Sequence, residues 1–502
     1  MPTDTDHTGD APQEPLAPAP AARATLVATV APPPDGQIRS GKLAGKSVPA
    51  AIVIIALPVL CEQFANAFVG LVDQVIAGSL PADVVKPALD GIGVGTYVGW
   101  FINICISAIG IGAAALIARA MGAGDRELSH STLAQGCTLG LIWGGIVGII
   151  LWLVAPLIAT FLGLAPASAG YFVQYVRVLA CGLPVTAVML VSMNSLHGAG
   201  ETTRPFLIMI VVNIVNVVAS WWLAGVPVVI GGIRLASPPG APLHVVGIAL
   251  GTVIAQAVGA VLMIVLMRRG IRDLRLEWSR LPVQRALFWR LARIGVPGFL
   301  EGIGLWFGNL CVLSVIGVIA AGNAGLVGAH SMAIRWESFA FLPGFAFGTA
   351  AAALGGQFLG AGNPSRAARA IWSCALLGAA FQGLCGLAFI FCGTQLTAII
   401  SRDPFHLDLV PRLLFLGGIA QVPFGLAMVL RVALRGVGDV KVVMAISWIT
   451  TWCIRLPIAW FVGVYLGHGI IGVWIVLSTE LWFRASMFVA RMLHGGWKTV
   501  RV

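Results

Sequence analysis

The chain has 502 residues, of which 58% are hydrophobic and only 10% are charged, and its mean hydropathy is +0.93. An ordinary soluble domain is about 45–50% apolar and about 25% charged, and a disordered chain combines low hydrophobicity with high charge. Both classes are therefore excluded. The formal net charge of +11 indicates basic cytoplasmic loops and contact with anionic membrane lipids, so we expect no nucleic-acid partner.

Long apolar segments predict membrane-spanning helices. They reach the roughly 20 residues that a helix needs to cross a bilayer and lack the short alternating pattern of barrel strands. We therefore expect an all-α polytopic membrane protein with twelve transmembrane helices. The predicted helices lie near residues 49–79, 89–118, 132–162, 169–195, 204–231, 244–267, 289–319, 325–356, 368–400, 408–433, 441–466 and 469–492.

The remaining segments are tails and one basic linker. Residues 1–48 are rich in Pro and Ala, lack the pattern of a secretory signal, and are predicted to form a disordered cytoplasmic tail. The linker 268–288 mixes arginines with Trp278 and several aliphatic residues, which predicts an interfacial helix on the inner leaflet. Residues 495–502 form the second tail, so the two bundles are 49–267 and 289–494.

The distribution of Lys and Arg predicts the orientation. The two tails and the even-numbered connections are basic, above all the linker, whereas the odd-numbered connections carry little beyond Lys86, Arg234 and Arg402. By the positive-inside rule both termini are cytoplasmic. We expect an integral protein of the bacterial inner membrane.

An internal repeat predicts the architecture. Three motifs of the first half return in the second half after 238 or 239 positions: 58–62 as 297–301, 122–125 as 360–363, and 196–201 as 434–439. Each repeat holds an even number of helices, so both repeats enter the membrane from the same side and are parallel. We expect two six-helix bundles related by a pseudo-two-fold axis along the membrane normal, an arrangement suited to alternating access.

These motifs resemble the multidrug and toxic compound extrusion (MATE) family over about residues 49–494. One matching element is the Pro-x-x-x-Glu motif at 297–301. Others are the Gly-Ala-Gly turns after helices 2, 4 and 8 and the corresponding Gly-Val-Gly turn after helix 10. The last is Arg455-Leu456-Pro457 in helix 11. The charged turn of major-facilitator transporters is absent after helix 2. The resemblance implies a V-shaped pair of bundles that exports cationic drugs and dyes in exchange for protons or sodium ions.

Helix 1 carries the first candidate coupling residues. Glu62, Asn66 and Asp73 lie within about 40° of one another on one helical stripe. A carboxylate left charged in lipid costs at least about 2.5–3.5 kcal/mol, which favours a functional role. The alternatives are a wetted interfacial residue for Asp73 and a protonated, hydrogen-bonded carboxyl for Glu62. Asp73 also resembles the helix 1 aspartate of the family, a proposed proton or cation site.

Helix 5 supplies a second polar stripe, formed by Asn213, Asn216 and Ser220. Such a stripe can support the coupling site or merely hold helices together. By the resemblance, Asn216 matches a family asparagine and Ser220 a position that is often acidic.

The C-terminal half is chemically different. Glu301 is the repeat mate of Glu62 and resembles the helix 7 glutamate of sodium-type members, but Val312 replaces Asp73 and Phe424 stands near their helix 10 aspartate. Protons are therefore favoured over sodium. We expect Arg431 and Arg435 to extend their side chains to the inner membrane surface.

Helices 8, 11 and 12 hold the other charged candidates. His330, Arg335 and Glu337 lie on helix 8, and Glu480 with Arg484 predicts an ion pair on helix 12. Arg455 shares a face with two tryptophans, which suggests a cation–π stack. Structural pairing is the favoured interpretation, and support of substrate binding or coupling by Arg455 and Glu337 is the alternative.

No enzyme, metal or organic cofactor is expected. The histidines are scattered, no Gly-x-Ser-x-Gly or Cys-x-x-Cys motif occurs, and no Cys/His spacing is typical of a metal site. We expect a monomer in contact with membrane lipids. The remaining alternative function is a flippase for lipids or lipid-linked oligosaccharides on a related fold.

Overall fold

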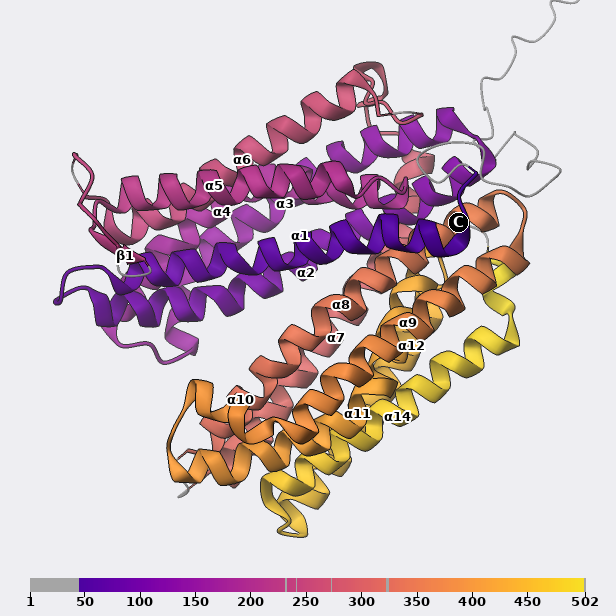
Figure 1. Cartoon of the computed structure of the whole chain (residues 1–502). Coiled ribbons are helices and arrows are strands. Elements are labelled where there is room, and N and C mark those ends of the chain that lie inside the picture. Colours follow the sequence, from indigo (N-terminus) through magenta and orange to yellow (C-terminus); the bar gives the residue numbers. More distant parts are fainter. Residues whose placement is uncertain (1–44, 231–232, 241, 272, 322–324, 501–502) are drawn as a thin grey trace, which may run out of the picture.

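The computed structural model describes residues 45–230, 233–240, 242–271, 273–321 and 325–500. Within these residues, 12 helical spans are long and apolar enough to cross a membrane, as predicted. They form two bundles that meet at one end and diverge toward the other (Figure 1). We call the meeting end, near the start of α1 (Val48–Gly78) and the linker, the linker end; the opposite end is the hairpin end.

The N-terminal bundle is made of six helices. After α1 come α2 (Val85–Ala123), α3 (Arg126–Phe161), α4 (Pro166–Gly198), α5 (Thr203–Ala224) and α6 (His244–Arg269). The C-terminal bundle begins with α7 (Arg285–Ile319), α8 (Leu326–Gly360), α9 (Pro364–Phe391), the short α10 (Gly393–Ile400) and α11 (Pro404–Gly436). Its last spans are α12 (Val440–Trp448), continued by the π-helical η2 (Ile449–Arg455), α13 (Leu456–Trp460) and η3 (Phe461–Tyr465), and then α14 (Gly469–His494).

The repeated Gly-Ala-Gly-Asp/Asn turns have one geometry in both bundles. Gly124 and Gly362 have φ values of +75° and +76°, a left-handed conformation that favours glycine. The next residue caps the following helix: Asp125 accepts a hydrogen bond from the Leu128 amide and Asn363 from the Arg366 amide, each at 2.9 Å. The repeated Gly-Ala-Gly-Asp/Asn motif therefore forms the same turn between two helices in both bundles.

Three predicted helices differ from the observed elements. The fifth helix ends at Ala224, because Gly225 adopts φ +68°, and is followed by an antiparallel hairpin of β1 (Val228–Ile230) and β2 (Ile233–Leu235). The predicted helix 368–400 is interrupted at Cys392. In the linker, the described residues between α6 and α7 form an isolated bridge between Ile271 and Leu274 and a 3₁₀ turn, η1 (Trp278–Arg280), so the predicted interfacial helix is wrong.

The linker instead packs against its own N-terminal bundle. The aliphatic side chains of Ile271, Leu274 and Leu276 are buried in a cluster with α2, α3 and α6, where they contact protein instead of lipid. The amide of Gln135 on α3 donates to the carbonyl oxygens of Arg280 and Pro282 at 2.8 and 2.6 Å. These contacts hold the linker along α3.

Two equivalent hydrogen bonds join the bundles at the linker end. Arg119 of α2 donates from Nη2 to the Val437 carbonyl oxygen at 2.8 Å. Gln357 of α8, 238 positions later, donates from Nε2 to the Gly198 carbonyl oxygen at 3.0 Å. Each repeat therefore binds the turn that ends the fourth helix of the other repeat.

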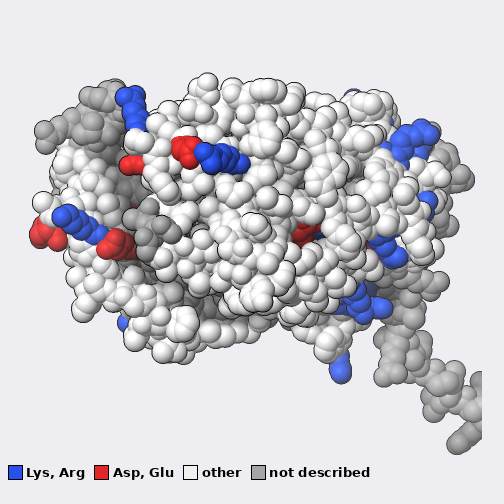
Figure 2. Space-filling view, turned by 90° about the horizontal axis from the view of Figure 1, so that it is seen from below, with Lys and Arg blue, Asp and Glu red and all other residues white. Residues whose placement is uncertain are grey.

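Charged residues gather at the two ends of the molecule. In the view of Figure 2 the middle of the surface is almost free of charge, and Lys and Arg predominate at the linker end. Large apolar side chains such as Ile149, Leu153 and Phe161 are exposed on α3. This arrangement matches a bilayer-spanning surface with basic residues on one side.

Candidate functional site

The N-terminal bundle contains a buried polar network centred on Asp73 of α1. The Tyr175 hydroxyl donates to Oδ2 of Asp73 at 2.8 Å, and the Thr252 hydroxyl lies 3.2 Å from both carboxylate oxygens. Asn216 donates from Nδ2 to the Thr252 hydroxyl at 3.0 Å and to the Ser220 hydroxyl at 3.3 Å. Asp73 is only 3% exposed. Four helices, α1, α4, α5 and α6, thus hold one carboxyl group.

Sequence reasoning found only part of this network. Asp73, Asn216 and Ser220 were candidates, and the structure brings them together. Two other candidates lie outside it. Asn66 is half-buried on α1, and Asn213 donates to the Met209 carbonyl oxygen of its own helix. Tyr175 and Thr252 were missed, since neither belongs to a repeated motif.

Glu62, on the same helix as Asp73, lies in a separate buried pair. Nε2 of His197, in the last turn of α4, is 3.0 Å from Oε2 of Glu62. Glu62 is 0% exposed, and its other oxygen, Oε1, has no hydrogen-bond partner. Glu62 and Asp73 therefore interact with different helices and different chemical groups.

Glu301 of α7 is flanked by two arginines of α11. Nη1 of Arg431 and Nη1 of Arg435 are each 3.6 Å from an oxygen of Glu301, and the Ser447 hydroxyl donates to Oε1 at 3.0 Å. The prediction that both arginines extend to the membrane surface is wrong. Both arginines turn inward to Glu301, whose negative charge offsets part of the cost of burying them.

A second carboxylate with two arginines lies between η2 and α14. Nη2 of Arg455 is 2.6 Å from Oε2 of Glu480, and the Nη2 of Arg484 is 2.7 Å from Oε1. The predicted Glu480–Arg484 ion pair is confirmed. The cation–π expectation for Arg455 is not met, since its guanidinium group turns to Glu480. Glu337 is half-buried on α8 beside Gly417 of α11.

The two bundles therefore differ in electrostatics. Glu301 and Glu480 each have two guanidinium groups nearby. Asp73 has only neutral hydroxyl and amide groups, and no basic residue of the described chain forms an ion pair with it. Asp73 is therefore a buried carboxylate whose charge no side chain neutralises within the described residues.

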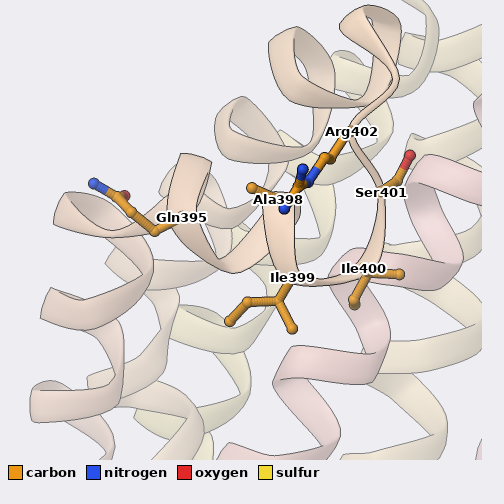
Figure 3. A pocket seen from close by; sticks show the side chains of 6 residues that line it. All are labelled: Gln395, Ala398, Ile399, Ile400, Ser401 and Arg402. Atoms are coloured by element: carbon orange, nitrogen blue, oxygen red, sulfur yellow. The ribbon is translucent and has the colours of Figure 1, made fainter.

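A surface depression at the hairpin end is not part of this arrangement. Figure 3 shows that its lining side chains all come from α10 and the following loop, with Gln395 directed away from Ser401 and Arg402. It contains no acidic residue and none of the candidate residues. The buried networks, and not this depression, define the candidate site.

Two repeated bundles of helices that are long and apolar enough to span a membrane, with buried acids inside, are typical of secondary transporters. A family model described as MatE matches residues 58–222 and again 297–461. The chain belongs to this family, and it is a transporter and not an enzyme.

Known relatives match over nearly the whole chain. The probable multidrug resistance protein NorM of Thermotoga maritima is 25% identical over 452 residues, which cover 89% of this chain and 92% of the relative. The multidrug resistance protein PmpM of Pseudomonas aeruginosa is 26% identical over 467 residues, or 90% and 92% of the two chains.

Solved structures show the same fold. An outward-facing multidrug resistance MATE family transporter of the MOP superfamily superposes with a TM-score of 0.80 at 18% identity, covering 91% of this chain and 98% of that one. A MOP superfamily transporter from Pyrococcus furiosus gives a TM-score of 0.79 at 19% identity, with the same coverage.

Proposed function

We propose that this protein is a multidrug efflux transporter that exports amphipathic organic cations in exchange for protons. The observation that carries the proposal is the environment of Asp73: a buried carboxylate, hydrogen-bonded by Tyr175 and Thr252, without a basic partner. The relatives' names, which refer to multidrug resistance, support the substrate range. They give no support to the flippase alternative.

The chemistry of exchange follows from the unbalanced charge of Asp73. A buried carboxylate is costly unless a cation or a proton neutralises it. A proton and a cationic substrate would compete for this single charge, so that binding of one favours release of the other. If the two bundles rock against each other so that the site opens to one side of the membrane and then to the other, competition between proton and substrate becomes exchange across the membrane.

The arrangement around Glu301 favours protons over sodium ions as the coupling ion. Sodium prefers several oxygen ligands around it and is repelled by adjacent positive charge. Glu301 already has Arg431 and Arg435 within 3.6 Å, and the nearby position 424 is a phenylalanine, which supplies no oxygen. Of the two acids, Asp73 is the better candidate for coupling.

The decisive experiment compares Asp73→Asn with the wild-type protein in proteoliposomes under an imposed pH gradient. Asp73→Asn keeps a hydrogen-bonding group of similar size but removes the charge, so we expect a folded protein without pH-driven ethidium transport. Asp90→Asn is the matched control, because Asp90 is an exposed aspartate near the hairpin end of α2. Wild-type transport by Asp73→Asn, or transport that needs a sodium gradient, would contradict the proposal.

The substrate class has its own test. Expression in a bacterium that lacks its drug pumps should raise resistance to cationic dyes more than resistance to anionic compounds. Equal protection against both classes would contradict a cation carrier. We propose a monomer surrounded by lipid, with exposed apolar residues such as Phe161 and Ile149 in contact with the acyl chains.

We propose further that the linker end faces the cytoplasm. The arginines of 268–293 and the basic residues next to the two tails support this orientation. Pro239, which is exposed beyond β2 at the hairpin end, should then lie outside. A cysteine at position 239 should react with a membrane-impermeant thiol reagent in intact cells; labelling only after permeabilisation would reverse the orientation.

A further inference from the structure

The group around Glu301 holds more positive than negative charge. Nη1 of Arg431 lies 3.6 Å from Oε1 of Glu301, and Nη1 of Arg435 lies 3.6 Å from Oε2. A guanidinium group stays protonated in a protein. Two positive charges therefore face at most one negative charge, and the two arginines are close enough to repel each other.

The hydrogen-bonding capacity of the two arginines is also unused. In the part of the chain that the structure describes, neither guanidinium group forms a hydrogen bond, since 3.6 Å is longer than an N–H···O bond. Nε of Arg431 is shielded from solvent and has no partner among these residues. By contrast, Arg455 and Arg484 bind Glu480 at 2.6 and 2.7 Å. The donors of Arg431 and Arg435 can therefore accommodate a further acceptor.

The neighbouring acids do not supply the missing negative charge. Glu480 is shared between Arg455 and Arg484, and Glu337 of α8 lies within electrostatic range of Arg455. Arg484 in turn lies within electrostatic range of Arg431, which joins the two groups. Even with every acid ionised, this joined group contains four arginines and three glutamates: Arg431, Arg435, Arg455 and Arg484 with Glu301, Glu337 and Glu480.

Other charged residues on the elements packed around α11 leave this excess in place. Asp439 pairs with Arg491 at 2.7 Å, so its charge is already neutralised. Arg119 of α2 donates to the carbonyl oxygen of Val437, two residues after Arg435, and adds positive charge on that side. The remaining side chains near this end of α9 and α12 are basic and exposed: Arg366, Arg369 and Lys441.

The first repeat lacks this excess. The repeat mate of Arg435, 238 positions earlier, is His197, which lies 3.0 Å from Glu62, the mate of Glu301. The repeat mate of Arg431 is Met193, a buried and uncharged residue. Arg431 therefore adds a charge that the same place in the other bundle does without, and the fold accommodates a methionine there.

We propose that Arg431 and Arg435 form a binding site for a small monovalent anion in the C-terminal bundle. Poorly solvated guanidinium groups need negative charge nearby, and Glu301 alone provides too little. Their N–H groups suit a chloride ion of the medium or the carboxylate group of an organic acid, which share a single negative charge and free lone pairs. Both side chains are partly exposed, so an anion can reach them. The site shares no residue with the Asp73 network and does not depend on the proposed role of Asp73.

The test measures the melting temperature of the purified protein in detergent. Sodium chloride or sodium acetate replaces sodium gluconate, a bulky anion, at constant ionic strength. A ligand that binds the folded state stabilises it, so the wild-type melting temperature should rise with the anion concentration. Arg431→Met, which introduces the residue of the first repeat, should lose this rise. In Glu301→Gln, where the competing carboxylate is gone, the rise should begin at about tenfold lower anion concentration.

Arg402→Met is the matched control, because it makes the same change at an exposed arginine of the hairpin end and should keep the rise. Arg431→Gln replaces Arg431→Met if the methionine variant does not fold. A rise with chloride alone identifies a halide site, and a rise with acetate identifies a carboxylate site. The same anion dependence in wild-type and folded Arg431 variants, or none in the wild type, would overturn the proposal. Wild-type crystals soaked in bromide should show anomalous density beside Arg431 and Arg435, and its absence would also overturn the site.

Discussion

Gly122 and Gly360 hold equivalent positions of the two repeats, and each lies against the backbone of the other bundle. A Cβ atom built on Gly122 would overlap with the carbonyl oxygen of Gln357, and one built on Gly360 would overlap with the carbonyl oxygen of Arg119. Arg119 and Gln357 are the residues that donate the two hydrogen bonds between the bundles. Glycine is thus required where α2 crosses α8, and this crossing closes the linker end.

Gly122→Val should therefore favour conformations in which the linker end is open. The added side chain has no room against the α8 backbone, and only separation of the bundles relieves the overlap. Spin labels at Arg204 and Arg366, exposed residues on opposite bundles near this end, should report a longer distance by double electron–electron resonance.

Gly99→Ala is the matched control, because it lies on the same helix and a Cβ atom there meets nothing within 4 Å. It should leave the spin-label distance distribution unchanged. An unchanged distribution in a folded Gly122→Val protein would show that the crossing does not hold this end closed.

The linker gives a prediction that depends on pH. The Arg280 guanidinium, at 2.6 Å, holds the pKa of Glu277 below its usual value of 4.5. A carboxyl whose pKa is depressed in the folded protein stabilises it above the unfolded pKa, and this stabilisation disappears as the pH falls through the folded pKa. The protection factors of the amides in 273–283, which correct for the slower intrinsic exchange in acid, should therefore be high at pH 7 and fall as the pH drops below 4.5, the usual pKa of this carboxyl group.

Glu277→Gln should show fast exchange in the linker already at pH 7. Asp408→Asn, which alters an exposed i,i+4 ion pair at the hairpin end, serves as the control and should leave linker exchange unchanged. Slow exchange in Glu277→Gln would indicate that the buried Ile271, Leu274 and Leu276 hold the linker without the ion pairs.

Much of the fold could be predicted from the sequence because the bilayer imposes it. In lipid, a helix pairs all the hydrogen-bonding groups of its own backbone, so a long apolar segment of the sequence predicts a membrane-spanning helix. The constant spacing between repeated turns gave the two bundles. The hairpin after Ala224, the break at Cys392 and the docked linker escaped prediction. Each depends on a local backbone conformation or on contacts between distant segments, and neither can be predicted from the hydropathy pattern or the repeat spacing.

The candidate site was predictable only where the chemistry is unusual in a membrane. An acid such as Asp73 stands out in an apolar helix, whereas Tyr175 and Thr252 are ordinary residues in such helices. Arg435 was assigned to the membrane surface because it lies near a helix end. Its actual partner, Glu301, is 134 positions earlier and belongs to a helix whose proximity follows from tertiary packing.

The arginines of the C-terminal bundle predict a stability defect. Glu301→Gln removes the charge between Arg431 and Arg435, whose side chains are 18% and 17% exposed. Two poorly solvated guanidinium groups without their counter-ion should cost about 3–5 kcal/mol. We expect a markedly lower melting temperature in detergent, while the folded fraction retains pH-driven transport.

Arg431→Gln, added to Glu301→Gln, should recover part of this loss because it removes one of the unpaired charges. Arg412→Gln, in the exposed pair with Asp408, is the control and should change stability by only about 0.3–0.5 kcal/mol. A wild-type melting temperature in Glu301→Gln would mean that water solvates the two arginines.

Tyr175 offers the sharpest test of the network that sequence reasoning missed. Tyr175→Phe removes the 2.8 Å hydrogen bond to Asp73 and leaves the aromatic ring that packs among the apolar side chains of the bundle. A hydrogen bond to a charged group contributes about 1.5–3 kcal/mol, so the ionised form of Asp73 should become less favourable by this amount. If ethidium binds to that charge, as proposed, it should bind about 10- to 100-fold more weakly at neutral pH. Tyr171→Phe is the matched control, because Tyr171 lies one turn earlier on α4 and is only partly buried. Fluorescence titration of the purified proteins with ethidium measures the effect. Equal affinities of Tyr175→Phe and the wild-type protein would show that the charge of Asp73 does not bind the cation.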